Sequence, residues 1–124
     1  YVDTYRHITL FVKNYSVELN IGGTKKVPNP TSYDIKSAIK STKNRNKKKF
    51  VILGKGASGY TFLQAYLEDE GTWTVEYQDG HLDKHFSAIR TISEEETLRI
   101  FSAYSEAVDN WRDEIEWVPL DLPD

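Results

Sequence analysis

Residues 50–87 read FVILGKGASGYTFLQAYLEDEGTWTVEYQDGHLDKHFS, and most of the predicted sheet lies in this stretch. Runs of β-branched and aromatic residues in and just beyond it predict four strands, at 50–53, 60–67, 72–78 and 84–90. In the third run the apolar residues Trp73, Val75 and Tyr77 alternate with polar ones, as in a strand with one buried face. The acidic turn Glu68–Gly71 and the Asp79–Gly80 pair separate consecutive strands. The stretch therefore predicts an antiparallel meander.

The glycines at 54, 56 and 59 match the G-x-G-x-x-G pattern of phosphate-binding loops. A dinucleotide site needs a helix directly after this motif, because the helix N-terminus holds the pyrophosphate. Here the motif is followed by Tyr60–Leu67, which is typical of a strand. A kinase loop would need a lysine on the next strand together with H-R-D and D-F-G motifs, and the sequence contains none of them. The glycines therefore predict a corner within the sheet, and no cofactor is expected.

The N-terminal part of the chain predicts a hairpin followed by a short helix. Strands are expected at 6–12 and 16–21, with the hairpin turn at 13–15. Thr31 or Ser32 is then expected to cap a helix. The apolar face of that helix carries Ile35, Ala38 and Ile39.

The C-terminal part predicts a second helix and a closing strand. Ser93 and Glu96 have the spacing of a capping box, and the helix is expected to run to about Asn110. Residues 116–120 contain a proline and predict an edge strand. The buried stripe of the helix is expected to consist of Leu98, Phe101, Ala103, Tyr104 and Val108. The sequence thus predicts a single α+β domain over residues 1–124, with an antiparallel sheet of about six strands and two helices on one face.

Charge is distributed very unevenly along the chain. The net charge is −3, but residues 1–60 hold 12 basic and three acidic residues (+9), whereas residues 61–124 hold four basic and 16 acidic residues (−12). Such an asymmetry directs attention to charged partners, although the two halves also offset each other on one surface. The basic segment 43–49 is either a solvated loop or a nucleic-acid patch. It contains no aromatic residue that could stack on bases, which favours the loop.

Two enzymatic alternatives involve the histidines. Asp79, His81, Asp83 and His85 would form a row of metal ligands on an extended strand, but the turn at Asp79–Gly80 breaks that row, and no metal site is expected. A small nuclease could use His85 or His7 as a base, with a phosphate-stabilising lysine, Lys55 or Lys84. Nothing in the sequence pairs these groups, and the acidic second half would repel RNA. We therefore expect no catalytic residue and no small-molecule substrate.

The more informative pattern is that acidic residues stand beside aromatic ones on predicted turns. Tyrosine and tryptophan are favoured anchors of protein interfaces, and carboxylates attract a basic partner. This pattern predicts a surface that binds a basic protein. Its residues are expected to be Tyr66, Glu68, Asp69, Glu70, Tyr77, Asp79, Asp83 and Trp111.

Several stretches of the chain resemble a known group of proteins. They are GYTFLQAYLEDEGTWTVEYQDG at 59–80, SEEETLRIFSAY at 93–104 and IEWVPL at 115–120, preceded by NPTSYDIKSAI at 29–39. With HF at 85–86 and Trp111, they are similar to immunity proteins of bacterial polymorphic toxins and contact-dependent inhibition systems. The resemblance is to the group that is paired with nucleic-acid deaminase toxins, and it covers residues 28–120.

The resemblance implies a cytoplasmic, non-enzymatic protein that binds one cognate toxin and blocks its active site. The toxin would be a basic protein that acts on nucleic acid, as a deaminase or a nuclease. No direct contact with nucleic acid or with a membrane is expected. The alternatives are the histidine-dependent nuclease and a general protein-interaction module.

Overall fold

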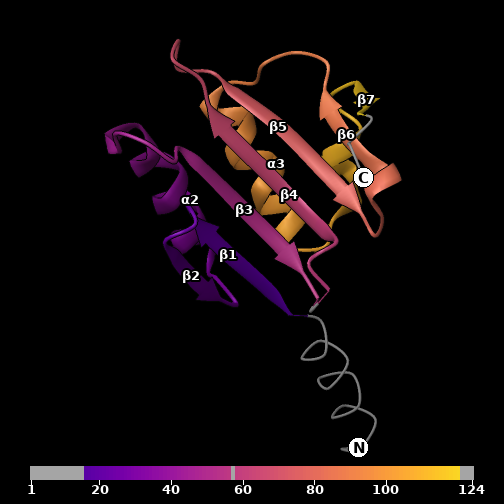
Figure 1. Cartoon of the computed structure of the whole chain (residues 1–124), viewed down its shortest axis with the longest axis horizontal. Helices are drawn as coiled ribbons and strands as arrows, with labels where there is room; N and C mark the ends of the chain where they lie inside the picture. The colour runs from indigo at the N-terminus through magenta and orange to yellow at the C-terminus, as the bar shows by residue number, and fades with distance from the viewer. Residues whose placement is uncertain (1–15, 57, 121–124) are drawn as a thin grey trace, which may run out of the picture.

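The computed structural model describes residues 16–56 and 58–120, which fold into an α+β structure around one antiparallel sheet (Figure 1). The strand order in the sheet is β2-β1-β3-β4-β5-β6-β7. The strands are β1 Val17–Ile21, β2 Lys25–Pro28, β3 Phe50–Lys55, β4 Thr61–Leu67, β5 Trp73–Asp79, β6 His85–Ala88 and β7 Trp117–Pro119. The prediction of the fold class is confirmed, and the described residues contain seven strands where about six were expected.

Two helices lie on the same face of the sheet, as predicted. They are α2 Ser32–Ser41 and α3 Glu94–Ser105, and Figure 1 shows α3 behind the strands, with the opposite face toward the viewer. Three single turns of 3₁₀ helix, η1 Thr42–Asn44, η2 Leu82–Lys84 and η3 Asp109–Arg112, complete the described elements.

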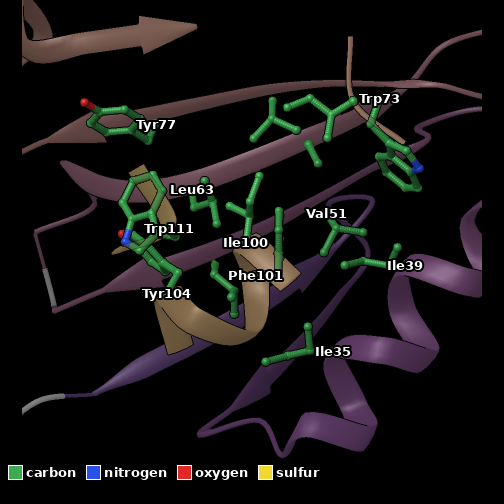
Figure 2. Packing of buried hydrophobic residues seen from close by; sticks show 14 of the residues in the cluster. Ile35, Ile39, Val51, Leu63, Trp73, Tyr77, Ile100, Phe101, Tyr104 and Trp111 are labelled. Atoms are coloured by element: carbon green, nitrogen blue, oxygen red, sulfur yellow. The ribbon is translucent and has the colours of Figure 1, made fainter. Parts of the chain in front are cut away.

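The core lies between the sheet and the helices, where the predicted alternation of β5 places its apolar side chains. Trp73, Val75 and Tyr77 are all buried, and Ile35 from α2 and Phe101 from α3 belong to the same buried cluster (Figure 2). Burying one such side chain contributes roughly 1.5–3 kcal/mol relative to leaving it exposed. The amphipathic patterns of the strands and helices therefore share one hydrophobic core.

Each helix begins at the residue that its sequence indicates. Thr31 caps α2 in a complete capping box, because its Oγ1 accepts from the Asp34 N–H (3.1 Å) and its own N–H donates to the Asp34 carboxylate (2.8 Å). Ser93 caps α3 by accepting from the Glu96 N–H at 3.2 Å. The predicted return bond from Glu96 to Ser93 is replaced by a bidentate pair with Arg90, whose shorter contact is 2.9 Å. A guanidinium offers a carboxylate two parallel charge-assisted bonds, which is a stronger arrangement than one backbone N–H.

The second helix is shorter than predicted, and it ends at Ser105 rather than near Asn110. Ala107 takes a left-handed conformation (φ 59°), and the Val108 N–H donates to the Ala103 carbonyl at 2.9 Å. This is the Schellman geometry that closes helix C-termini, usually with glycine at the left-handed position. Because alanine stands there, the end of the helix carries no sequence signal. Val108, predicted to be buried, is 41% exposed beyond that end.

Two further predictions concern the N-terminal strands. Strand 16–21 is confirmed as β1, while the predicted strand at 6–12 and its turn at 13–15 lie outside the described residues. Both edges of β1 are paired, one with β3 and the other with β2. The sequence did not predict β2, because its lysines and Pro28 are unfavourable in strands. They are tolerated because β2 lies at the edge of the sheet.

The glycine motif connects β3 to β4, two antiparallel neighbours in the sheet. Gly54 and Lys55 belong to β3 itself, and Gly56 and Gly59 take positive φ angles (77° and 79°) in the connection. The motif therefore links strand to strand, as predicted, and no helix N-terminus follows it.

Candidate functional site

The predicted partner-binding residues fall into two groups at opposite ends of the β4–β5 hairpin. Leu67 pairs with Trp73 at one end, and Thr61 pairs with Asp79 at the other. At about 3.4 Å per residue, the two ends are separated by about 20 Å. The structure therefore does not bring the two acidic turns together.

The first group lies at the turn that joins β4 to β5, and its residues are accessible. The Tyr66 side chain is 46% exposed, and Asp69 and Glu70 are exposed on the turn. The Glu68 carboxylate accepts a hydrogen bond from the Thr74 hydroxyl, which orients it along the hairpin. We term these four predicted residues, which lie at or next to this turn, the acidic tip: Tyr66, Glu68, Asp69 and Glu70.

The second group contains two aromatic residues that the structure buries. Tyr77 is 7% exposed and Trp111 is 4% exposed, and their rings meet edge to face with centroids 5.0 Å apart (Figure 2). Burial raises the pKa of the Tyr77 phenol above its ordinary value, an effect that the nearby Arg112 opposes. The expectation that these two rings are exposed anchors is wrong. Tyr77 shares the inward face of β5 with Trp73 and Val75, so its alternation already indicated burial.

The acidic members of the second group remain accessible. Asp79 and Asp83 are both exposed, and an Asp79 carboxylate oxygen lies 3.9 Å from Nη2 of Arg112. Such an exposed contact contributes little to stability. This end of the hairpin thus offers two carboxylates without an exposed aromatic neighbour from the predicted set.

The sheet presents its second face on the side opposite the helices. No described helix packs on it, and its side chains come from alternate positions of the central strands. We term this surface the open face. It includes Glu18 and Asn20 from β1, Phe50, Ile52 and Gly54 from β3, Phe62, Gln64 and Tyr66 from β4, Thr74, Glu76 and Gln78 from β5, and His85 and Ser87 from β6.

A hydrogen-bonded cluster occupies the β5–β6 part of the open face. His85 Nε2 lies 2.7 Å from the Glu76 carboxylate, and His85 Nδ1 lies 3.0 Å from Oε1 of Gln78. The Gln78 amide is oriented by its own bond to the Tyr60 carbonyl at 3.0 Å. The ring of Phe62 meets the imidazole edge to face, with centroids 5.9 Å apart. The cluster thus fixes both the histidine and the aromatic ring beside it.

This arrangement argues against His85 as the base of a nuclease. Both ring nitrogens already face oxygen acceptors, and the residue is only 4% exposed, so no nitrogen is directed at a substrate. Lys84, the proposed phosphate-binding partner, is the neighbouring residue, and it precedes β6 at the end of η2. Within the described residues, no group of three or more histidine or acidic side chains could hold a metal ion.

A groove of about 600 Å³ lies over the β1, β3 and β4 part of the open face. Gly54, one of its lining residues, has no side chain and lies between Glu18 and Phe62 along one cross-strand row. Ile52 and Gln64 form the neighbouring row. The prediction of site residues missed this set, although the signal was present in the period-2 alternation of the strands. The outward positions of a strand carry the surface chemistry once the inward positions are known.

Comparisons of the chain with protein-family models, curated proteins and solved structures found no match. Among the described helices, none is both long and apolar enough to cross a membrane.

Proposed function

We propose that the protein is a bacterial immunity protein that binds a cognate toxin and occludes its active site. The toxin would be a basic protein that acts on nucleic acid, as a deaminase or nuclease, and the complex would form in the cytoplasm. On this proposal the protein has no catalytic activity, and the two partners meet through preformed surfaces. It would serve competition between bacteria that deliver such toxins by contact.

The observation that carries the proposal is the uncovered sheet face and the acidic tip that extends it. Ile52, Phe62 and Tyr66 give this face partly exposed apolar area, while Glu18 and Glu76 supply carboxylates. Interfaces of this type combine aromatic anchors with charges that complement the partner. A toxin that binds nucleic acid must present a basic cleft, which this surface fits in charge.

Neutralisation of the toxin encoded by the adjacent gene tests the proposal. Co-expression is expected to restore growth, and the two proteins are expected to co-purify. The triple charge reversal E68K/D69K/E70K should lower the association rate at least tenfold at low salt, because exposed interface charges act mainly on the rate of encounter. Association kinetics measured with one partner immobilised, at several salt concentrations, give this rate.

A matched variant controls for net charge. The reversals E95K/E106K/E114K change the charge equally, but all three residues are exposed on or next to the helical side of the molecule. This variant should associate nearly as fast as the parent protein. Equal losses in both triple variants would mean that net charge alone attracts the partner. Failure of the unaltered protein to bind or neutralise the neighbouring product would contradict the proposed function.

A further inference from the structure

We infer that the groove over Gly54 is a receptor for an arginine side chain presented by a protein partner. The inference rests on the proposed function, since it names the anchor that the toxin would insert. It also assigns a purpose to the glycine motif, which joins β3 to β4 and is not followed by a helix.

The hollow exists because position 54 lacks a side chain in the middle of a cross-strand row. The register places Gly54 between Glu18 on β1 and Phe62 on β4. A Cβ atom built on Gly54 would meet nothing closer than the Thr61 carbonyl, at 4.0 Å. The backbone of Gly54 also lies outside the left-handed region, unlike that of Gly56 and Gly59. Conformation therefore does not require glycine at this position, whereas an open hollow does.

The walls of the hollow suit a planar cation. On one side stands the Glu18 carboxylate, which has no ion pair among the described residues, and on the other stands the Phe62 ring. A guanidinium can bond a carboxylate bidentately while stacking on an aromatic face, which a lysine ammonium does less well. The Gln64 amide lines the same groove and offers a further acceptor.

The neighbouring groups hold this arrangement in place without filling it. Phe62 is supported from behind by His85, which Glu76 and Gln78 fix through both ring nitrogens. Lys55 contributes to the rim, but its ammonium lies 3.9 Å from the centroid of the Tyr104 ring on the helical side. Lys55, the cation in the lining of the groove, is therefore directed toward the helical side, and the Glu18 carboxylate is the charged group beside the hollow. The volume of about 600 Å³ accommodates a long side chain and the backbone that bears it.

The test is a titration of the whole chain with Nα-acetyl-arginine amide, monitored by NMR through the chemical shifts of the backbone amides. Saturable shifts in the millimolar range are expected at Gly54, Phe62 and Gln64. Nα-acetyl-lysine amide, which keeps its ε-ammonium group, should bind several-fold more weakly. Nα-acetyl-citrulline amide, the uncharged isostere of the arginine compound, should produce no saturable shift. Equal shifts with citrulline, or shifts confined to the acidic turns at 68–71 and 79–83, would overturn the inference.

Two variants of the hollow and one control variant extend the test. Gly54→Leu fills the hollow at a position with open space and ordinary backbone angles, and it should weaken arginine binding at least tenfold while leaving the melting temperature nearly unchanged. Glu18→Gln should weaken it several-fold. Ser37→Leu adds similar bulk at an exposed position of α2, on the helical side of the sheet, and should bind arginine normally. Unaltered binding by Gly54→Leu would exclude the hollow as the site.

The arginine receptor and the proposed function fail in different ways. If the chain binds arginine amide but neutralises no toxin, the receptor is supported and the immunity function is contradicted. If Gly54→Leu protects cells against the toxin as well as the unaltered protein does, the function is supported and the role of the hollow as the toxin's anchor site is contradicted.

Discussion

At the scale of single residues, exposure separates the aromatic side chains that stabilise the fold from those that are available to a partner. Trp111 and Tyr77 were predicted as anchors of an interface, yet they contact each other in the core. Tyr66 comes from the same predicted set and is 46% exposed on the open face. The three residues share a chemical character but have different roles, because only Tyr66 occupies an outward strand position.

Truncation of Trp111 should therefore lower stability, whereas truncation of Tyr66 should affect binding. Trp111→Ala should lower the free energy of unfolding by about 3–5 kcal/mol, because it leaves a large cavity among packed rings. Tyr66→Ala should change it by less than about 1 kcal/mol. Urea unfolding followed by circular dichroism gives both values. Under the proposed function, Tyr66→Ala should instead weaken binding to the toxin, and equal stability losses in the two variants would contradict this division.

His85 provides a second prediction at this scale. His85→Ala leaves the Gln78 oxygen and the Glu76 carboxylate without their partner and removes the support of Phe62, so a loss of about 1–3 kcal/mol is expected. His81→Ala is the control, because His81 is exposed in the turn before η2 and makes no side-chain cap bond there. Denaturant titration compares the two variants. If the two variants have equal free energies of unfolding, the cluster does not contribute to stability.

At the scale of elements, the helix starts follow from local chemistry, whereas the helix ends do not. Thr31 and Ser93 precede amphipathic patterns and accept bonds from the N–H groups three residues on. The end of α3 depends on Ala107 in a left-handed conformation, and alanine in a sequence does not indicate such a conformation. The edge strand β2 was missed for a similar reason, since its lysines and proline are acceptable only where one side stays unpaired.

The capping box of α2 can be tested directly. Thr31→Ala removes the oxygen that accepts the Asp34 N–H, and a loss of about 1 kcal/mol is expected. Ser32→Ala alters the next residue, which is exposed and lies in the first turn of the helix, and should be close to neutral. Thermal unfolding of both variants measures the difference. A neutral Thr31→Ala would mean that α2 is held by packing alone.

The ion pair at the start of α3 predicts that the stability of the protein depends on pH. The bidentate bond to Arg90 lowers the pKa of the Glu96 carboxyl below its ordinary value of 4.5. Because the folded pKa is depressed, the contribution of Glu96 to stability is present above the unfolded value and is lost as the pH falls through the folded one. Glu96→Gln should therefore melt at a lower temperature than the parent protein at pH 7, and this difference should disappear in stronger acid. Glu95→Gln, which removes a charge from the same turn, should show a smaller difference, and a Glu96 effect that persists in acid would contradict the assignment.

At the scale of the whole molecule, the arrangement of the sheet decides which charged segments act together. The basic segment 43–49 leads into β3, and the Leu67 N–H donates to the Lys49 carbonyl at 2.9 Å, so this segment and the acidic tip lie at the same end of the sheet. The charge asymmetry along the sequence is therefore not a simple division of the surface. Asp79 and Asp83 lie at the opposite end, about 20 Å away along the hairpin.

The sequence alone determined the meander, the two helix starts and the inward side of β5, because each depends on periodicity or capping between residues close in the chain. It also showed that the glycine motif lacks the helix that a phosphate site needs. Only the tertiary structure established that Glu18, Gly54 and Phe62 line one hollow, and that Trp111 packs in the core against Tyr77. These relations join residues that are far apart in sequence, and they depend on the register and order of the strands. Strand register is set by the packing of the whole core, which no local pattern contains.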